Sequence, residues 1–222
     1  MKLSILIMLL TLTAVTATFA QQITAEEKLK YEKTITERAD KIVVGLGIAD
    51  QRKSDKVRDI IKNQYSDLNN IHSARDLIVK QIKEEQKDNK VERDSALAKE
   101  NRNTETALSK LHKKYIARLS AQLTNEQIDL VKNGMTYNVL PITYKAYQEE
   151  ILTLTEDQKK QILAWLTEAR EHAIDAESSD KKHAWFGKYK GRINNYLSAA
   201  GYDLKKEGIE WEKRRKAKAE AN

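Results

Sequence analysis

The chain has 222 residues, a formal net charge of +7 at pH 7, no cysteine, seven glycines and one proline. The absence of cysteine excludes disulfides, thiolate metal sites and cysteine nucleophiles. Few turn-forming residues, beside many Ala, Leu, Lys and Glu, favour an all-α fold, and this length suits one domain with an ordinary hydrophobic core.

The first twenty residues are typical of a secretory signal peptide. Lys2 precedes an apolar run at 3–12, and small residues follow up to Ala20. The run is too short to span a bilayer, and no later segment is long and apolar enough. We expect cleavage near Ala20, an exported protein in the periplasm or outside the cell, and no membrane span.

The first helix is predicted to begin after Thr24. Thr24 and Glu27 have the S/T-x-x-E spacing of a capping box, in which each side chain bonds the other residue's backbone amide. Gly45 and Gly47 follow the apolar stripe and are expected to end this helix.

Two longer helical patterns follow, at 57–82 and 97–119. Between them, eleven of the twenty residues at 84–103 are charged, so this stretch is expected to form the exposed tip of a helical hairpin or a mobile connection. We therefore predict a helical bundle with a long antiparallel hairpin and shorter C-terminal helices. The near-heptad spacing also makes a homodimer reasonable.

Two later helix starts share the form LTxxQ, at 123–127 and 154–158. Each has the residues of a capping box, with Thr as the N-cap and Gln three positions later. The pair resembles the LTxxQ motifs of the Spy/CpxP class of periplasmic helical proteins, which implies a chaperone-like or structural role as an alternative function.

The segment between these motifs contains the only proline. Gly134 is expected to end a short helix, 135–140 to be extended, and Pro141 to be the first residue of the next helix. Asp203 is expected to cap a last helix that Trp211 anchors, and 213–222 to be a frayed basic tail. The single helical domain then covers residues 21–212.

A candidate binding face lies within residues 181–202. At 100° per residue, Phe186, Ile193, Leu197 and Ala200 form one side, expected to be core. The other side combines aromatic rings for stacking with cations and an amide for polar contacts: Trp185, Lys188, Tyr189, Arg192, Asn195 and Tyr196. The competing interpretation is that this second side packs on another helix.

A second polar face has helical spacing at Asn69, His72, Arg75 and Asp76. Glu168, His172 and Asp175 form a similar polar face later in the chain. If the two helices meet, these groups could form a metal site or a histidine base oriented by a carboxylate. No HExxH or comparable signature supports either, so we expect no metal and no cofactor, and a polysaccharide-acting enzyme remains an alternative.

Positive charge is concentrated near the C-terminus. Residues 180–192 contain five cations and one Asp, and residues 205–222 contain seven cations and four Glu. Such a field favours an anionic partner or is simply a solvated face. Nucleic acid is an improbable partner for an exported protein, which leaves acidic glycans, lipid headgroups or an acidic protein. Of these, an acidic plant-type polysaccharide is favoured.

Several segments along the mature chain resemble one family of secreted proteins, the domain-of-unknown-function family 3826. They include RADKIVVGLGIAD, MTYNVLPITYKAYQ, LTEDQKKQILAWLTEAREHAIDA, HAWFGKYKGRINNYL and GYDLKKEGIEWEKR. The resemblance implies an exported protein with a sugar-binding role, and it brings no established catalytic residues.

Overall fold

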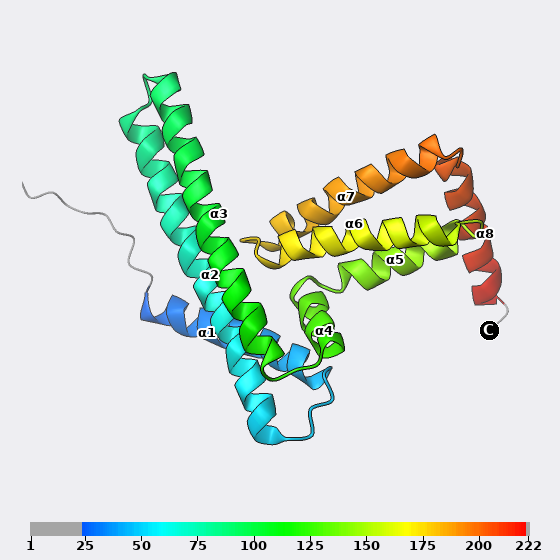
Figure 1. Ribbon diagram of the computed structural model, residues 1–222, viewed down its shortest axis with the longest axis horizontal. Helices are drawn as coiled ribbons and strands as arrows, with labels where there is room; N and C mark the ends of the chain where they lie inside the picture. The colour runs from blue at the N-terminus through cyan, green and yellow to red at the C-terminus, as the bar shows by residue number, and fades with distance from the viewer. Residues whose placement is uncertain (1–23, 221–222) are drawn as a thin grey trace, which may run out of the picture.

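The computed structural model describes residues 24–220 and has eight helices, with no strand among these residues (Figure 1). The predicted all-α fold is therefore confirmed. The predicted signal peptide lies outside the described residues. In chain order the helices are α1 (Ala25–Val44), α2 (Gln51–Glu85), α3 (Lys90–Ser120), α4 (Asn125–Met135), α5 (Val139–Glu150), α6 (Glu156–Ile174), α7 (Ser179–Ala199) and α8 (Leu204–Glu220).

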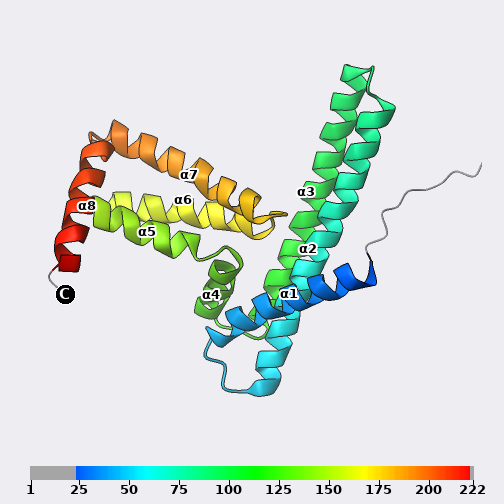
Figure 2. The ribbon, with the colours of Figure 1, turned by 180° about the vertical axis from the view of Figure 1, so that it is seen from behind.

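Helices α2 and α3 form a long antiparallel hairpin that projects from the rest of the molecule (Figures 1 and 2). Asp50 begins α2 by accepting hydrogen bonds from the amides of Arg52 and Lys53. The turn at 86–89 forms the tip, within the highly charged stretch. The predicted hairpin and its exposed, charged tip are thus confirmed.

A first hydrophobic core lies where α1 and α4 pack on the lower part of this hairpin. The Tyr115 hydroxyl donates to the sulfur of Met135 at 3.1 Å inside it. The last residue of α6, Ile174, also belongs to this core. Helix α6 therefore reaches from the second half of the chain into the first core.

A second core joins α5, α6 and α7 into another arm, and α8 lies across its far end (Figures 1 and 2). Phe186, Ile193 and Leu197 are buried here, as predicted. Ala200, predicted on the same face, is exposed because it lies at the C-cap, beyond the last turn of α7.

Buried charge fixes α6 against α4. Arg170 is only 5% exposed, and its guanidinium donates to Asp129 Oδ1 at 2.6 Å and to Asn133 Oδ1 at 2.9 Å. Lys132 and Glu171 form an ion pair of 2.8 Å beside it. Since a buried cation needs such partners, this network ties the two arms together.

The α4–α5 connection differs from the prediction. Met135 ends α4 and Val139 begins α5, so residues 135–140 are not extended and Pro141 is the third residue of its helix rather than the first. Pro141 still lies in the first turn, where a backbone N–H has no intrahelical acceptor. The helix can therefore start two residues earlier without losing a hydrogen bond.

Gly134 does not end α4, contrary to the prediction, but lies inside it. A Cβ at this position would lie 2.7 Å from Ile42 Cγ1, so glycine permits the close approach of α4 to α1. The left-handed residues that end α4 are instead Tyr137 (φ 58°) and Asn138 (φ 56°).

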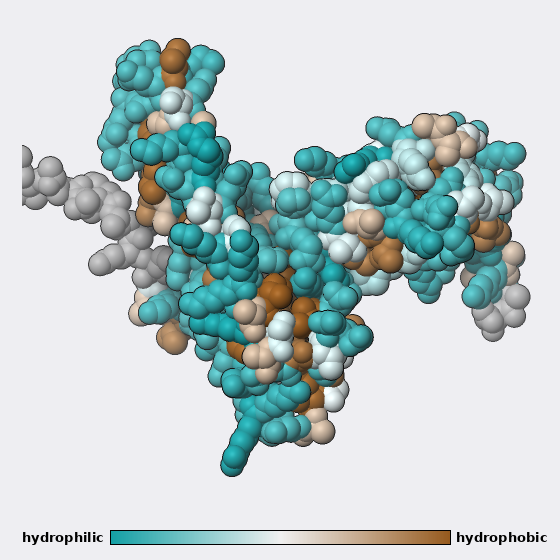
Figure 3. Space-filling view, in the orientation of Figure 1, coloured by the Kyte–Doolittle hydropathy of each residue, from teal (hydrophilic) through white to brown (hydrophobic). Residues whose placement is uncertain are grey.

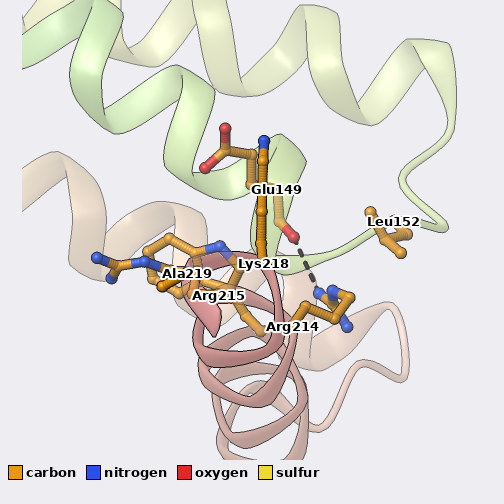
Figure 4. Close-up of a pocket in the computed structure, with 7 residues that line it drawn as sticks. Glu149, Leu152, Arg214, Arg215, Lys218 and Ala219 are labelled. Carbon is orange, nitrogen blue, oxygen red and sulfur yellow. Dashed lines mark hydrogen bonds between the residues drawn. The ribbon is translucent and has the colours of Figure 1, made fainter. Parts of the chain in front are cut away.

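The C-terminal segment, for which we predict a frayed tail at 213–222, is helical as far as Glu220, the last described residue. Arg214 donates to the carbonyl oxygen of Glu149 at 2.9 Å (Figure 4) and to that of Glu150 at 3.0 Å. These bonds satisfy carbonyls at the end of α5, which a helix leaves without intrahelical donors. They hold α8 in place.

Hydrophilic residues cover most of the face shown in Figure 3, and hydrophobic ones gather near the base of the hairpin and in smaller patches on the second arm. Within residues 24–220, no helix is long and apolar enough to cross a membrane.

Candidate functional site

A cleft of about 660 Å³ lies where the hairpin meets the inner ends of α6 and α7. In Figure 1 the inner ends of α6 and α7 face the hairpin. We call this cleft the junction cleft. The residues that matter for its chemistry are His72 and Arg75 of α2, His112 of α3, Glu171 and His172 of α6, Asp175 and Glu177 of the following connection, and Lys181 and Trp185 of α7.

His72 is held by the end of α6. Its Nε2 lies 2.8 Å from the carbonyl oxygen of Asp175, so this nitrogen carries a proton and donates. The other ring nitrogen, Nδ1, is buried without a hydrogen bond and lies 3.4 Å from Glu177 Oε2. Both ring nitrogens of His72 therefore face oxygen atoms at the end of α6 and in the connection to α7.

His112 forms the closest histidine–carboxylate pair of the cleft. Its Nδ1 lies 2.7 Å from Asp175 Oδ2, and its Nε2 lies 3.6 Å from Glu171 Oε2. The hydrogen bond to Asp175 raises the pKa of His112, and the two negative charges add to this effect against the opposing effect of burial. The other oxygen of Asp175 is buried without a partner.

An aromatic wall completes the cleft. The rings of His172 and Trp185 stack with centroids 4.3 Å apart and an interplanar angle of 14°. His172 is exposed and Trp185 is half-buried, because one edge of the pair contacts solvent while the other contacts the second core. The Lys188 ammonium lies 5.1 Å from the centre of the Trp185 ring, which suits a cation–π contact.

Charges of both signs line the junction cleft. The cations are Arg75, Lys113 and Lys181, and the carboxylates are Glu105, Glu171, Asp175 and Glu177. The site therefore offers both donors and acceptors, without a strong excess of one charge.

Of the face predicted on residues 181–202, Trp185 lines the junction cleft. Tyr189 is only 5% exposed and belongs to the second core, so its ring is not accessible for stacking. Burial and a hydrogen bond to Glu168 raise the pKa of Tyr189 to about 12. Lys188 and Asn195 are exposed but do not line this cleft.

The remaining residues of that face surround another tryptophan. The Arg192 guanidinium lies 4.5 Å from the centre of the Trp165 ring, and Tyr196 meets the same ring edge-on at 5.2 Å. Arg192 also lies 3.8 Å from Glu168. These contacts join α6 to α7 and do not reach the junction cleft.

The second predicted polar face has a different outcome. His72, Arg75 and His172 all line the junction cleft together with Trp185, so the two helices do meet there. Asp76 does not line the cleft and pairs with Arg75 at 3.2 Å. Across residues 24–220, no group of three His, Asp or Glu side chains is placed to hold a metal ion.

His112 was not identifiable as a site residue from the sequence. It lies beside the apolar stripe of α3, and its partner Asp175 lies 63 residues away. The only local signal is a histidine next to Leu111 in an otherwise charged helix. Its role depends on how α3 and α6 cross, which helical periodicity does not reveal.

The LTxxQ motifs are capping boxes, as predicted. Thr124 with Gln127, and Thr155 with Gln158, exchange the two expected bonds at the starts of α4 and α6. Gln127 also donates to the carbonyl of Leu46 at 3.0 Å. These polar side chains are therefore used inside the fold.

A shallower groove of about 530 Å³ lies between α5 and α8 (Figure 4). Its Arg214 bonds the end of α5, and Arg215 lies 5.1 Å from the centre of the Trp211 ring. Because the Arg214 guanidinium holds α8 against α5 and the Arg215 guanidinium packs on a ring of its own helix, this groove is a weaker candidate than the junction cleft.

The fold and cleft define an all-helical, two-armed protein with a polar, aromatic cleft between the arms. The family model described as protein of unknown function (DUF3826) matches residues 32–217, and the chain belongs to that family. The match covers all the residues of the junction cleft. No curated protein matches the chain.

Proposed function

We propose that this protein is an exported, non-catalytic carbohydrate-binding protein that holds a glycan in the junction cleft. The observation that carries the proposal is the stacked His172–Trp185 pair in the wall of a cleft that is also lined by charged side chains of both signs. A sugar ring offers apolar C–H groups to an aromatic surface and hydroxyl groups to surrounding donors and acceptors.

The charges of the protein and of the cleft indicate which class of glycan would bind. Net positive charge of the whole chain favours an acidic polysaccharide. The cleft itself contains four carboxylates as well as three cations, and this mixture suits the hydroxyl groups of a glycan. An acidic sugar would have to place its carboxylate beside Arg75, Lys113 or Lys181.

The test is titration calorimetry against a panel of neutral and acidic plant oligosaccharides, with two variants. Trp185→Ala removes the larger ring, and His172→Ala removes an exposed ring whose loss should leave the fold intact. Each should weaken binding by about tenfold, because an aromatic contact contributes roughly 0.5–1.5 kcal/mol beyond its buried area. Circular dichroism checks that both variants are folded.

The matched control is Asn195→Ala, because Asn195 is an exposed residue of α7, the helix of Trp185, and lines neither this cleft nor another cavity near it. It should bind the panel like the unchanged protein. If the unchanged protein binds no oligosaccharide of the panel, the proposal is overturned. Suppressed aggregation of an unfolded client would then favour the chaperone-like alternative.

The His112–Asp175 pair favours a second candidate function, acid–base catalysis on the bound glycan. A carboxylate that orients a histidine in a ligand cleft is an arrangement used for proton transfer. If this second function is correct, the protein should cleave one oligosaccharide of the panel into smaller sugars, and His112→Gln should abolish the cleavage. Unchanged oligosaccharides after long incubation would exclude it for that panel.

A further inference from the structure

A second cleft lies near the junction cleft, between α1, α2, the α4–α5 turn and the start of α7. It consists of two adjoining cavities, of about 490 and 240 Å³, that share Arg38, Tyr65, Tyr137 and Lys182 in their walls. Tyr31 adds a third tyrosine to the smaller cavity. We call the pair of cavities the tyrosine cleft.

The larger cavity has cations and no carboxylate in its wall. Its charged residues are Arg38, Lys41 and Lys182. Within the described part of the chain, neither Arg38 nor Lys41 lies within ion-pair distance of a carboxylate. Of the two cavities of the tyrosine cleft, only the smaller one has Glu177 in its wall, where Glu177 lies near His72. Positive charge in the larger cavity is therefore not neutralised locally.

Lys182 is the most unusual of these cations. The sequence places it in an exposed basic patch, yet it is only 6% exposed. Its Nζ donates to the carbonyl oxygens of Ala173 and Ile174 at 3.1 and 3.0 Å. These bonds cap the end of α6, but neither partner carries a compensating charge.

The titration of Lys182 agrees with this geometry. Burial lowers its pKa to about 8, the charge of Asp175 opposes that shift, and the charge of Arg38 adds to it. A charged group that burial destabilises gains from a nearby anion.

Aromatic groups supply the other wall. Tyr137 has a left-handed backbone (φ 58°), which is a rare conformation for a bulky residue, and its ring stacks on His183 at 5.5 Å. Its side chain is 42% exposed. Within residues 24–220, the hydroxyls of Tyr65 and Tyr137 make no hydrogen bond, so both can donate to a ligand.

We propose that the tyrosine cleft binds the oxyanion of a small organic acid or phosphate, between Arg38 and Lys182, with the Tyr65 and Tyr137 hydroxyls as further donors. The cavity volumes suit a ligand of about monosaccharide size. This site adjoins the glycan site and shares His72, Ala176 and Glu177 with it, but none of its proposed donors lines the junction cleft, and the proposal does not depend on glycan binding.

The experiment is titration calorimetry of the full mature chain at about pH 7 with three probes: galacturonate, inorganic phosphate and galactose. Galacturonate and galactose have the same ring framework and differ in the carboxylate. We expect saturable binding of at least one anion, weakened by added salt, and none of galactose. Binding of galacturonate alone identifies a sugar acid, and binding of phosphate identifies a phosphate site.

Arg38→Gln is the main variant, because Arg38 is exposed and its replacement should not affect folding. It should weaken anion binding by about tenfold, the loss expected for one charge-assisted contact. Lys33→Gln is the matched control, since Lys33 lies on the same helix with an exposed side chain and is not in the tyrosine cleft. Lys182→Met is a second test, which removes the buried charge while keeping the length of the side chain.

Four results would overturn the proposal, and three of them concern the probes and Arg38. These three are no saturable binding of either anion, equal binding of galactose, and an Arg38→Gln variant that binds like the unchanged protein. Loss of anion binding in His172→Ala would also overturn it, because that result would move the anion to the junction cleft. Failure of the glycan proposal leaves these outcomes unaffected.

Discussion

The junction cleft and the tyrosine cleft share His72, Ala176 and Glu177 in their walls, yet they differ in charge. The junction cleft combines three cations with four carboxylates, whereas the larger cavity of the tyrosine cleft has three cations and no carboxylate. Two surfaces on the same α6–α7 connection can therefore suit different ligands, a polyhydroxylated one and an anionic one.

The two clefts also differ in backbone strain. Among residues 24–220, the only non-glycine residues with positive φ are Tyr137 and Asn138, and both line the tyrosine cleft. The junction cleft is built instead from regular helix and one short connection. Strain of this kind persists where surrounding structure enforces it, and it often accompanies a binding site.

The largest expected effect is common to both clefts. Arg170→Ala removes a buried side chain together with its hydrogen bonds to Asp129 and Asn133, and it should lower the free energy of unfolding by about 3 kcal/mol. Because the variant loosens α6 from α4, it should weaken the binding of both the glycan and the anion. Urea unfolding followed by circular dichroism measures the loss.

Arg192→Ala is the control for that change. Arg192 pairs with Glu168 at 3.8 Å with both side chains about half exposed, so its loss should change stability by no more than about 1 kcal/mol. If the two arginine variants prove equally stable, the α4–α6 network does not hold the arms together.

A smaller effect should separate the clefts. His172→Ala should weaken glycan binding by about tenfold and leave anion binding unchanged. Arg38→Gln should weaken anion binding by about tenfold and leave glycan binding unchanged. Because the two side chains line different clefts, a double variant should show the sum of the single effects for each ligand. The measurement is titration of both ligands into the unchanged protein, the two single variants and the double variant. If either single variant weakens the binding of both ligands, the two clefts act as one site.

Local patterns in the sequence predict the helices well. The capping pairs at Thr24, Thr124 and Thr155 lie within three residues of their partners, so their chemistry is visible in the chain. The same holds for the charged hairpin tip. The prediction at 135–140 fails because Pro141 can lie in the first turn of α5, where its missing N–H loses no hydrogen bond, so the helix includes the residue before it.

Contacts between distant helices are what the sequence does not reveal. His112 meets Asp175 only because α3 crosses the end of α6, and Lys182 is buried only because it bonds the last carbonyls of that helix. Helical periodicity gives the face of a residue but not the partner opposite it. Trp185 and His72 were each identifiable as candidates, while their shared cleft was not.

The third prediction concerns pH. Since the folded state raises the pKa of His112 above its usual value near 6.5, the stabilisation from the Asp175 bond is complete below that pH. It is lost as the pH rises through the raised value. The free energy of unfolding should therefore fall more between about pH 6 and about pH 8 in the unchanged protein than in His112→Gln.

The difference between the two unfolding curves isolates His112, because Lys182 and every other titrating group are present in both proteins. The measurement is urea unfolding at a series of pH values with salt held constant. Parallel curves would mean that the His112–Asp175 bond contributes nothing to stability in solution.

The smallest effect tests the strain that distinguishes the tyrosine cleft. Tyr137→Gly and Tyr137→Ala both remove the ring and its contact with His183, but only glycine adopts φ 58° without a Cβ penalty. The glycine variant should be more stable than the alanine variant by about 1 kcal/mol, or about 2–4 °C in Tm for a chain of this size. Both variants should bind the anion more weakly than the unchanged protein, because each loses the Tyr137 hydroxyl. Equal melting temperatures would show that the turn relaxes without its tyrosine, and the left-handed backbone would then be a consequence of the ring's contacts.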